Sequence, residues 1–315
     1  MNAEVGRGKI ESPFGNRFHD VAEFAKNSDS PCRFVRKIVH LPLQAQFLCS
    51  HSILSLLCLF VLTSSCWSAE LVTGRIWMRS YEFKQANREM EYALYLPEGY
   101  DAKKSYPLMV ALHGLNSNPR QILGYRGFTK LAQQHGYILA APMGYNTRGW
   151  YGGLGQTARR WRPRNLGELS EKDVMNVLKI VRADFNVDSK RIFLMGHSMG
   201  GGGTWHLGIK YPDIWAGLAP IAPATFRSPD DLANIKTTPV ILVQGDKDRL
   251  VPVRGARRWA SRMKELGMQY KYIEVEGGDH IRPAITQLPA IFEFFATHAK
   301  SVSSNKETPR RDKHP

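Results

Sequence analysis

The sequence predicts an α/β protein with an open, mostly parallel, doubly wound β-sheet and helices on both of its faces. Apolar runs of strand length recur along the chain, and stretches with helical periodicity separate them. One apolar run ends in a glycine-rich turn that leads into a further helix. Parallel strands buried on both faces are apolar throughout, and the helices that connect them cover the sheet. These three observations define the expected fold class.

Apolar patterning places the strands. From Met90 to Leu96 apolar residues alternate with other residues, which is the period of a strand with one buried face, and Pro97 ends it. Further strands are predicted at residues 107–112, 137–142, 192–195, 216–221, 239–243 and 270–275. Most of these are continuous apolar runs, as expected for strands that are buried on both faces.

Helical periodicity falls between the strands. Ser170 to Asp173 has the pattern of a capping box, and the apolar spacing after it predicts a helix that continues to Phe185. A second helix is predicted to follow the glycine-rich turn. Two more are lined by apolar residues within 253–263 and 285–295, and Gly267 ends the first of these.

The chain divides into four regions by composition. Residues 1–32 are polar and are expected to be disordered or to lie upstream of the true start, and residues 301–315 form a polar, disordered tail. Residues 70–300 are expected to form the α/β domain. In residues 33–69, basic residues precede the ten-residue apolar run 53–62, and small residues follow. This pattern predicts a signal peptide and export to the periplasm or medium; an uncleaved anchor and a lipidated Cys66 are the alternatives.

Charge and cysteine content limit the kinds of interaction that the α/β domain can make. The chain has 43 basic and 28 acidic residues, and residues 70–315 keep 36 and 23 of them. This excess is typical of a well-solvated surface, with anionic partners as the alternative. The cysteines all lie upstream, at Cys32, Cys49, Cys58 and Cys66. The domain therefore has no thiol for a disulfide or a thiolate metal site.

The glycine-rich turn is G-H-S-M-G, residues 196–200, with three more glycines after it. A sharp turn between a strand and a helix would present Ser198 at the carboxyl edge of the sheet on strained backbone. Side chains at positions 196 and 200 would collide where strand and helix approach, and glycine avoids that collision. The turn therefore predicts Ser198 as a nucleophile.

A serine nucleophile needs a base, and the base needs an orienting carboxylate. The strand at 270–275 leads to His280, which precedes the last helix, and we expect it to be the base. The strand at 239–243 leads to Asp246 and Asp248. Asp248 lies deeper in its loop and is favoured as the acid, whereas Asp246 is the alternative. Asp279 is expected to be a turn residue.

The tetrahedral intermediate of acyl transfer needs two backbone N–H donors. Met199 follows the nucleophile at the start of a helix and supplies the first. The second is expected from Leu115, directly after His113-Gly114 at the end of the strand 107–112. Because both donors belong to the backbone, their side chains are free to vary.

Four sequence motifs together resemble a known superfamily. They are Leu112–Gly114, Gly196–Gly201 with Tyr211–Asp213 after it, Asp248 with Val251-Pro252, and Gly278–His280. Over residues 90–298 the chain resembles the α/β-hydrolase superfamily, and within it the polyhydroxybutyrate depolymerase and feruloyl-esterase-like group. It also resembles exported peptidases related to the prolyl oligopeptidase catalytic domain. The resemblance implies the α/β-hydrolase fold, with Ser198 as nucleophile, Asp248 as acid and His280 as base.

The connection from Gly144 to Leu169 is long for a loop in a compact domain. It is rich in arginine and holds Trp150, Tyr151 and Trp161. At the carboxyl side of the sheet it would either cover Ser198 and present these aromatic side chains to a substrate, or form a surface loop with an apolar anchor. Both interpretations remain open at this point.

Other site classes lack support in the sequence. No metal-ligand or Walker spacing is present, so we expect neither a metal nor another cofactor. The G-x-G-x-x-A at 153–158 follows no strand, and the arginines near Trp161 form one isolated cluster, so no nucleic acid is expected. We expect an exported hydrolase of small or polymeric carboxylic esters that acts through an acyl-enzyme. A peptidase of the same fold and a non-catalytic binding protein are the alternatives; the oligomeric state is not predicted.

Overall fold

One eight-stranded sheet, in the order β1-β2-β4-β3-β5-β6-β7-β8, organises the part of the chain that the structure describes. The computed structural model describes residues 71–154 and 163–299, which belong to one of two compact units, residues 66–315. The predictions for residues 1–32, 33–69 and 301–315, with Cys66 and Trp161, lie outside the described residues. Within the described ranges, no helix has the length and apolar character needed to span a bilayer.

The elements alternate as the patterning predicts. The strands are β1 (Ile76–Phe83), β2 (Arg88–Tyr95), β3 (Tyr106–Leu112), β4 (Ile138–Pro142), β5 (Val187–His197), β6 (Gly217–Ile221), β7 (Val240–Gly245) and β8 (Tyr270–Val275). The α-helices are α1 (Pro119–Leu123), α2 (Phe128–His135), α3 (Leu166–Asp184), α4 (Met199–Lys210), α5 (Arg254–Glu265), α6 (Arg282–Thr286) and α7 (Leu288–Ala296). Short 3-10 helices are η2 (Lys84–Ala86), η3 (Trp150–Gly152) and η5 (Pro229–Ile235).

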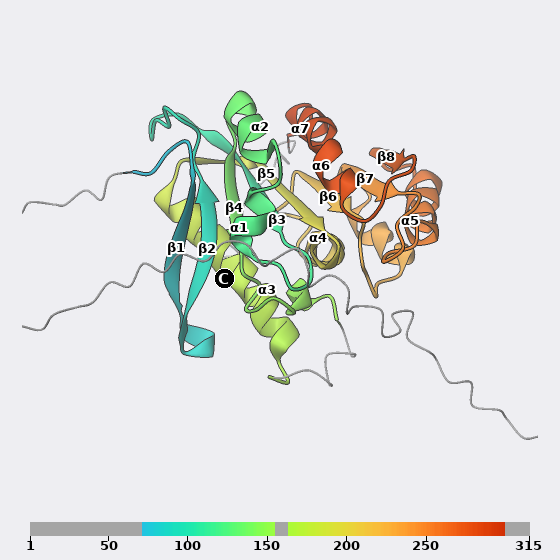
Figure 1. Cartoon of the computed structure of the whole chain (residues 1–315), viewed down its shortest axis with the longest axis horizontal. Coiled ribbons are helices and arrows are strands. Elements are labelled where there is room, and N and C mark those ends of the chain that lie inside the picture. Colours follow the sequence, from blue (N-terminus) through green and yellow to red (C-terminus); the bar gives the residue numbers. More distant parts are fainter. Residues whose placement is uncertain (1–70, 155–162, 300–315) are drawn as a thin grey trace, which may run out of the picture. The chain divides into compact units, whose positions relative to one another are not determined.

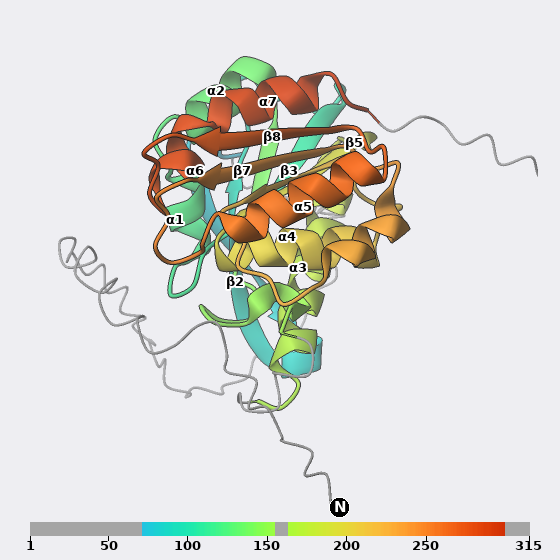
Figure 2. The ribbon, with the colours of Figure 1, turned by 90° about the vertical axis from the view of Figure 1, so that its right-hand side faces the viewer.

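Helices cover both faces of the sheet, which confirms the predicted fold class. Helices α2 and α7 lie along one face, and α3, α4 and α5 lie along the other (Figures 1 and 2). The first face carries the larger apolar core, in which side chains of α1, α2, α6 and α7 pack on strand residues such as Phe193 and Met195. Among the described strands, the pairs β1–β2 and β2–β4 are antiparallel, so β2 alone runs against the direction of the others. Burial of apolar side chains between these layers is the main driving force for this arrangement.

Five elements differ from the sequence predictions. Strand β1 and helices α1 and α2 were not predicted, because they are short or lie at the edge of the sheet. The closing helix is divided into α6 and α7 at Gln287. β2 is buried on both faces from Tyr92 onward, not on one.

The capping-box prediction at Ser170 is wrong. Helix α3 begins at Leu166, so Ser170 and Asp173 lie inside it and are fully buried. Their side chains bind the preceding connection instead of their own helix: Ser170 Oγ accepts from the N–H of Tyr151 at 2.9 Å, and Asp173 Oδ2 accepts from that of Gly144 at 2.6 Å. Polar residues that are hydrogen-bonded to a loop are compatible with a buried helix face.

The parallel strands bring the predicted site residues to one edge. Strands β3 to β8 all run in the same direction, so their carboxyl ends share an edge of the sheet. The segments that begin at His113, Ser198, Asp246 and Glu276 leave the sheet there. Crevices at the carboxyl ends of such strands are the usual binding sites of α/β proteins.

Candidate active site

Ser198 occupies a strained turn between β5 and α4. Its φ of 59° and ψ of −116° are unusual for a residue with a side chain. A Cβ on Gly196 would lie 2.2 Å from the carbonyl oxygen of Gly200, and one on Gly200 would lie 2.1 Å from that of Leu112. The steric reason given for these two glycines is therefore confirmed. The same tight packing holds Ser198 at the sheet edge, where it is only half buried.

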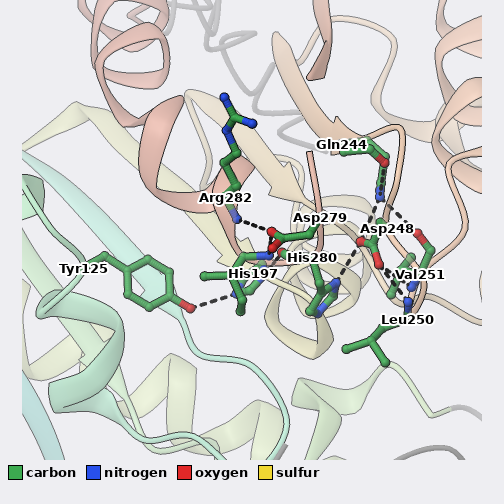
Figure 3. A network of polar contacts seen from close by, with 11 residues as sticks. Tyr125, His197, Gln244, Asp248, Leu250, Val251, Asp279, His280 and Arg282 are labelled. Atoms are coloured by element: carbon green, nitrogen blue, oxygen red, sulfur yellow. Dashed lines mark hydrogen bonds and ion pairs between the residues drawn. The ribbon is translucent and has the colours of Figure 1, made fainter. Parts of the chain in front are cut away.

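His280 lies beside a buried carboxylate. Its Nδ1 is 2.8 Å from Oδ2 of Asp248, whose side chain is fully inaccessible to solvent (Figure 3). The other oxygen, Oδ1, accepts from the N–H groups of Leu250 and Val251 at 2.9 and 2.8 Å. Four contacts in total fix the carboxylate, because Oδ2 also accepts from Nε2 of Gln244 at 3.0 Å.

The structure separates the competing aspartates. Asp248, and not Asp246, has its carboxylate against the imidazole of His280. One carboxylate oxygen of Asp246 is buried without a hydrogen-bond partner among the described residues. Asp279 Oδ1 accepts from the N–H groups of Ile281 and Arg282 at the start of α6, which is the turn role expected for it.

The ionisation of Asp248 determines which nitrogen of His280 carries a proton. Burial raises the pKa of Asp248, but the hydrogen bonds from His280, Val251 and Leu250 outweigh it and hold that pKa below its usual value. An ionised carboxylate only accepts hydrogen bonds, so Nδ1 of His280 carries the proton. In the neutral imidazole Nε2 has a free lone pair, and no partner for it occurs among the described residues. This nitrogen can accept a proton from a nucleophile.

The predicted oxyanion loop lies against the nucleophile. A Cβ on Gly114 would be 3.6 Å from the Cβ of Ser198, so the backbone of this loop passes directly beside the serine. Leu115 is half buried, and Met199 is the first residue of α4. Among the described turns and loops, no backbone oxygen accepts from either N–H group. Both groups are therefore available to a developing oxyanion.

The aromatic residues of the long connection have different environments. Tyr151 is 0% exposed, and its hydroxyl donates to the carbonyl oxygen of His113 at 3.1 Å. Trp150 is 7% exposed and packs on Phe226. Tyr151 thus has no exposed surface for a substrate and instead contacts the backbone of the predicted oxyanion loop. Trp161 is outside the described residues.

This connection is also strained. Trp150, Tyr151 and Gly152 all have positive φ, at 56°, 50° and 88°. Left-handed backbone at residues with side chains costs free energy and persists only where surrounding contacts enforce it. Here the hydrogen bonds of Tyr151 to Ser170 and His113 supply that support.

Sequence reasoning did not identify two members of the polar network in Figure 3. Gln244 donates to Asp248, and Tyr125 donates to Nδ1 of His197 at 2.8 Å. A polar residue at the end of the apolar strand β7 is a signal that could have revealed Gln244. Tyr125 lies in a turn 72 residues before its partner and gives no such signal.

The described residues include no cluster of three or more histidine, cysteine or acidic side chains arranged to hold a metal ion. The groups that the site contains are a serine hydroxyl, an imidazole, a carboxylate and backbone N–H groups.

The fold and this constellation define an α/β hydrolase. The Esterase family model matches residues 84–295, and the chain belongs to that family. Among curated proteins it is similar to cutinase 2 of Thermobifida cellulosilytica, with 29% identity over 124 residues, covering 39% of this chain and 45% of that protein. It is also similar to mouse (Mus musculus) S-formylglutathione hydrolase, with 28% identity over 151 residues and coverage of 43% and 52%. The chain thus spans about half the length of these relatives.

Solved structures show the same fold. A ferulic acid esterase from Anaeromyces mucronatus, in complex with ferulic acid, superimposes with a TM-score of 0.58 at 20% identity, covering 73% of this chain and 92% of that one. An S-formylglutathione hydrolase from Agrobacterium tumefaciens gives a TM-score of 0.58 at 17% identity, with coverage of 70% and 94%. At these identities the likeness establishes the architecture.

Proposed function

We propose that this protein is a serine hydrolase that cleaves carboxylic esters through an acyl-enzyme. The observation that carries the proposal is the fixed Asp248–His280 pair at the sheet edge that also presents Ser198 on a strained turn. Membership of the Esterase family supports the same reaction class. In this proposal Ser198 is the nucleophile, His280 the base and Asp248 the orienting acid.

Acylation would begin with attack of Ser198 Oγ on the ester carbonyl carbon, while its proton passes to Nε2 of His280. The carbonyl oxygen becomes an oxyanion, which the N–H groups of Leu115 and Met199 stabilise. The imidazolium then gives its proton to the leaving alkoxide as the ester C–O bond breaks. Asp248 stays ionised and stabilises the imidazolium.

Deacylation repeats these steps with water. His280 takes a proton from a water molecule that attacks the acyl carbon, and the resulting oxyanion occupies the same two N–H groups. When the intermediate collapses, the acyl C–Oγ bond breaks and the proton returns to Ser198. The products are one carboxylic acid and one alcohol, and no cofactor takes part.

The substrate class follows from the relatives. Their names describe hydrolases of cutin, S-formylglutathione and ferulic acid esters, so both small and polymeric esters are included. We include depolymerase, feruloyl-esterase and acetyl-esterase activities in the proposal. Trp150, within the strained connection, is 7% exposed and so offers a substrate only a small part of its surface.

Export is part of the same proposal. It is supported by the basic residues, the apolar run and the small residues of segment 33–69. Mass spectrometry of the N-terminus of protein recovered from the periplasm or medium would detect cleavage near Ala69. An uncleaved or lipid-modified N-terminus would favour membrane attachment instead.

A fluorophosphonate probe tests the proposed reaction directly. We expect the wild-type protein to be labelled at Ser198 and to hydrolyse 4-nitrophenyl acetate, and Ser198→Ala to do neither while it keeps its melting temperature. A panel of short-chain, aromatic and polymeric esters, with peptide 4-nitroanilides beside it, then separates esterase from peptidase. Folded wild-type protein that resists labelling while a reference serine hydrolase reacts would exclude the proposal.

A further inference from the structure

His197 has a hydrogen-bonding neighbour in each of two separate loops. It ends β5, immediately before Ser198, and is 2% exposed. On one side is the hydroxyl of Tyr125, in the turn after α1, and on the other is the main chain of His280 (Figure 3). The imidazoles of His197 and His280 also pack together, with ring centroids 4.8 Å apart.

The hydrogen bonds fix the tautomer of His197. Its Nε2 is 2.8 Å from the carbonyl oxygen of His280, which can only accept, so Nε2 carries the proton. Nδ1 is then an acceptor, and the hydroxyl of Tyr125 donates to it at 2.8 Å. Burial, with the neighbouring His280 as the next cause, lowers the pKa of His197 to about 3. The ring therefore stays neutral, and both bonds persist, at neutral and mildly acidic pH.

We propose that His197 is a positioning residue that sets the base loop against the nucleophile, and that Tyr125 orients it. His280 is held at two points: Asp248 from the β7 loop binds its side chain, and His197 from β5 binds its carbonyl oxygen. Because His197 and Ser198 are adjacent, the second bond links the position of the base to that of the nucleophile. This inference rests on the proposed function.

Other contacts would keep the loop folded without His197. The N–H of Gly278 donates to the carbonyl of Val275, and that of Lys247 donates to the carbonyl of Gly278. Asp279 binds the first N–H groups of α6. Removing the bond from His197 should therefore free His280 locally rather than unfold the segment. A misplacement of about 1 Å can cost about 10²-fold in rate.

Two substitutions of His197 separate positioning from packing. The amide of His197→Gln reaches the position of Nε2 and can still donate to His280, whereas the shorter His197→Asn reaches only the position of Nδ1. With 4-nitrophenyl acetate we expect His197→Asn to lower kcat by about tenfold or more at nearly unchanged KM. The kcat of His197→Gln should be much closer to that of the wild-type protein. Tyr125→Phe should lower kcat less, in the same direction.

Tyr137→Phe is the matched control. Tyr137 is a tyrosine with 3% exposure, but it precedes β4, at the opposite edge of the sheet. Its kcat should equal that of the wild type. Melting curves establish that each variant is folded.

The outcomes distinguish this inference from the proposed function. If wild-type protein is active but folded His197→Asn keeps its kcat within about twofold, or His197→Gln loses as much as His197→Asn, the inference fails and the proposed function stands. Should His197→Asn not fold, Tyr125→Phe decides, because an unchanged kcat would overturn the inference. Wild-type protein that neither reacts with fluorophosphonate nor hydrolyses esters would contradict both this inference and the proposed function.

Discussion

Two histidine–carboxylate pairs with the same spacing occur in this molecule. His280 and Asp248 are 2.8 Å apart at the carboxyl edge of the sheet, and His206 and Glu171 are 2.8 Å apart between α4 and α3. Both imidazoles are largely buried, with side-chain exposures of 12% and 13%. Distance and burial alone therefore do not separate a catalytic pair from a structural one.

The pairs differ in what else their atoms contact. Glu171 also accepts from Lys210 and from the hydroxyl of Tyr211, and an Arg227 nitrogen lies 3.3 Å from the second nitrogen of His206. Burial raises the pKa of Glu171, but the bonds from His206, Lys210 and Tyr211 outweigh it and lower the pKa to about 2. Both nitrogens of His206 thus have neighbours.

His280 has one nitrogen against Asp248, and the other has no partner among the described residues. The carboxylate of Asp248 is held by backbone N–H groups and by the amide of Gln244. Among the described residues, no second charged side chain bonds to it. An imidazole can shuttle protons only if one nitrogen remains accessible to a reacting group. The comparison shows that the unoccupied nitrogen, more than the ion pair, distinguishes the candidate base.

Replacing each histidine by alanine gives the largest expected contrast. His280→Ala should lower kcat by about 10⁶-fold, because the serine loses its base. His206→Ala should leave kcat nearly unchanged and lower the free energy of unfolding by about 1–3 kcal/mol, since it leaves buried polar atoms unpaired. Steady-state ester hydrolysis and urea denaturation measure the two effects. Similar losses of activity in both variants would remove the distinction.

Replacing the carboxylates gives a smaller effect on rate. Asp248→Asn should lower kcat by about 10⁴-fold, because an amide no longer enforces the tautomer of His280. Glu171→Gln and Asp246→Asn should be active, and Glu171→Gln should be less stable. The same hydrolysis assay tests all three. An inactive Asp246→Asn beside an active Asp248→Asn would reverse the assignment of the acid.

Asp173 is a third buried carboxylate, and it has no ion-pair partner among the described residues. It is 0% exposed and bonded to Tyr81 and Gly144, and burial raises its pKa to about 6. Because this value exceeds that of the unfolded chain, the folded protein binds more protons between about pH 4 and pH 6. As the pH rises through this window, ionisation of Asp173 should lower the free energy of unfolding by up to about 3 kcal/mol.

Asp173→Asn should abolish that pH-dependent loss, because the amide does not ionise. Urea denaturation of both proteins between about pH 4 and pH 7.5 gives the difference in their free energies of unfolding. We expect the wild-type protein to lose stability relative to the variant as the pH rises. A difference that is constant with pH, or one that changes in the opposite direction, would contradict the raised pKa.

Much of the fold could be predicted because it follows from local patterns. The apolar runs of β3, β4, β5, β6 and β7 and the glycines around Ser198 depend on neighbours in the sequence. Strand β1 could not be found in this way, since it is an edge strand without a fully apolar run. Helix α3 was placed too late, because Ser170 and Asp173 look like caps when their loop partners are unknown.

The candidate site was less accessible to sequence reasoning. The order of Ser198, an aspartate and His280 along the chain could be read directly, because each follows a predicted strand. The environment of Tyr151 could not, because a tyrosine buried against the backbone of His113 and one exposed to a substrate have the same sequence signature.

The sequence by itself determined the parallel sheet, the strained turn at Ser198 and the edge at which the polar residues gather. Tertiary structure alone decided which aspartate faces His280, and that His197 binds its carbonyl oxygen. The physical reason is the separation along the sequence of the residues that interact. Periodicity and turn sterics act between residues a few positions apart, whereas these contacts join residues that are 32 and 83 positions apart and depend on strand register and loop path.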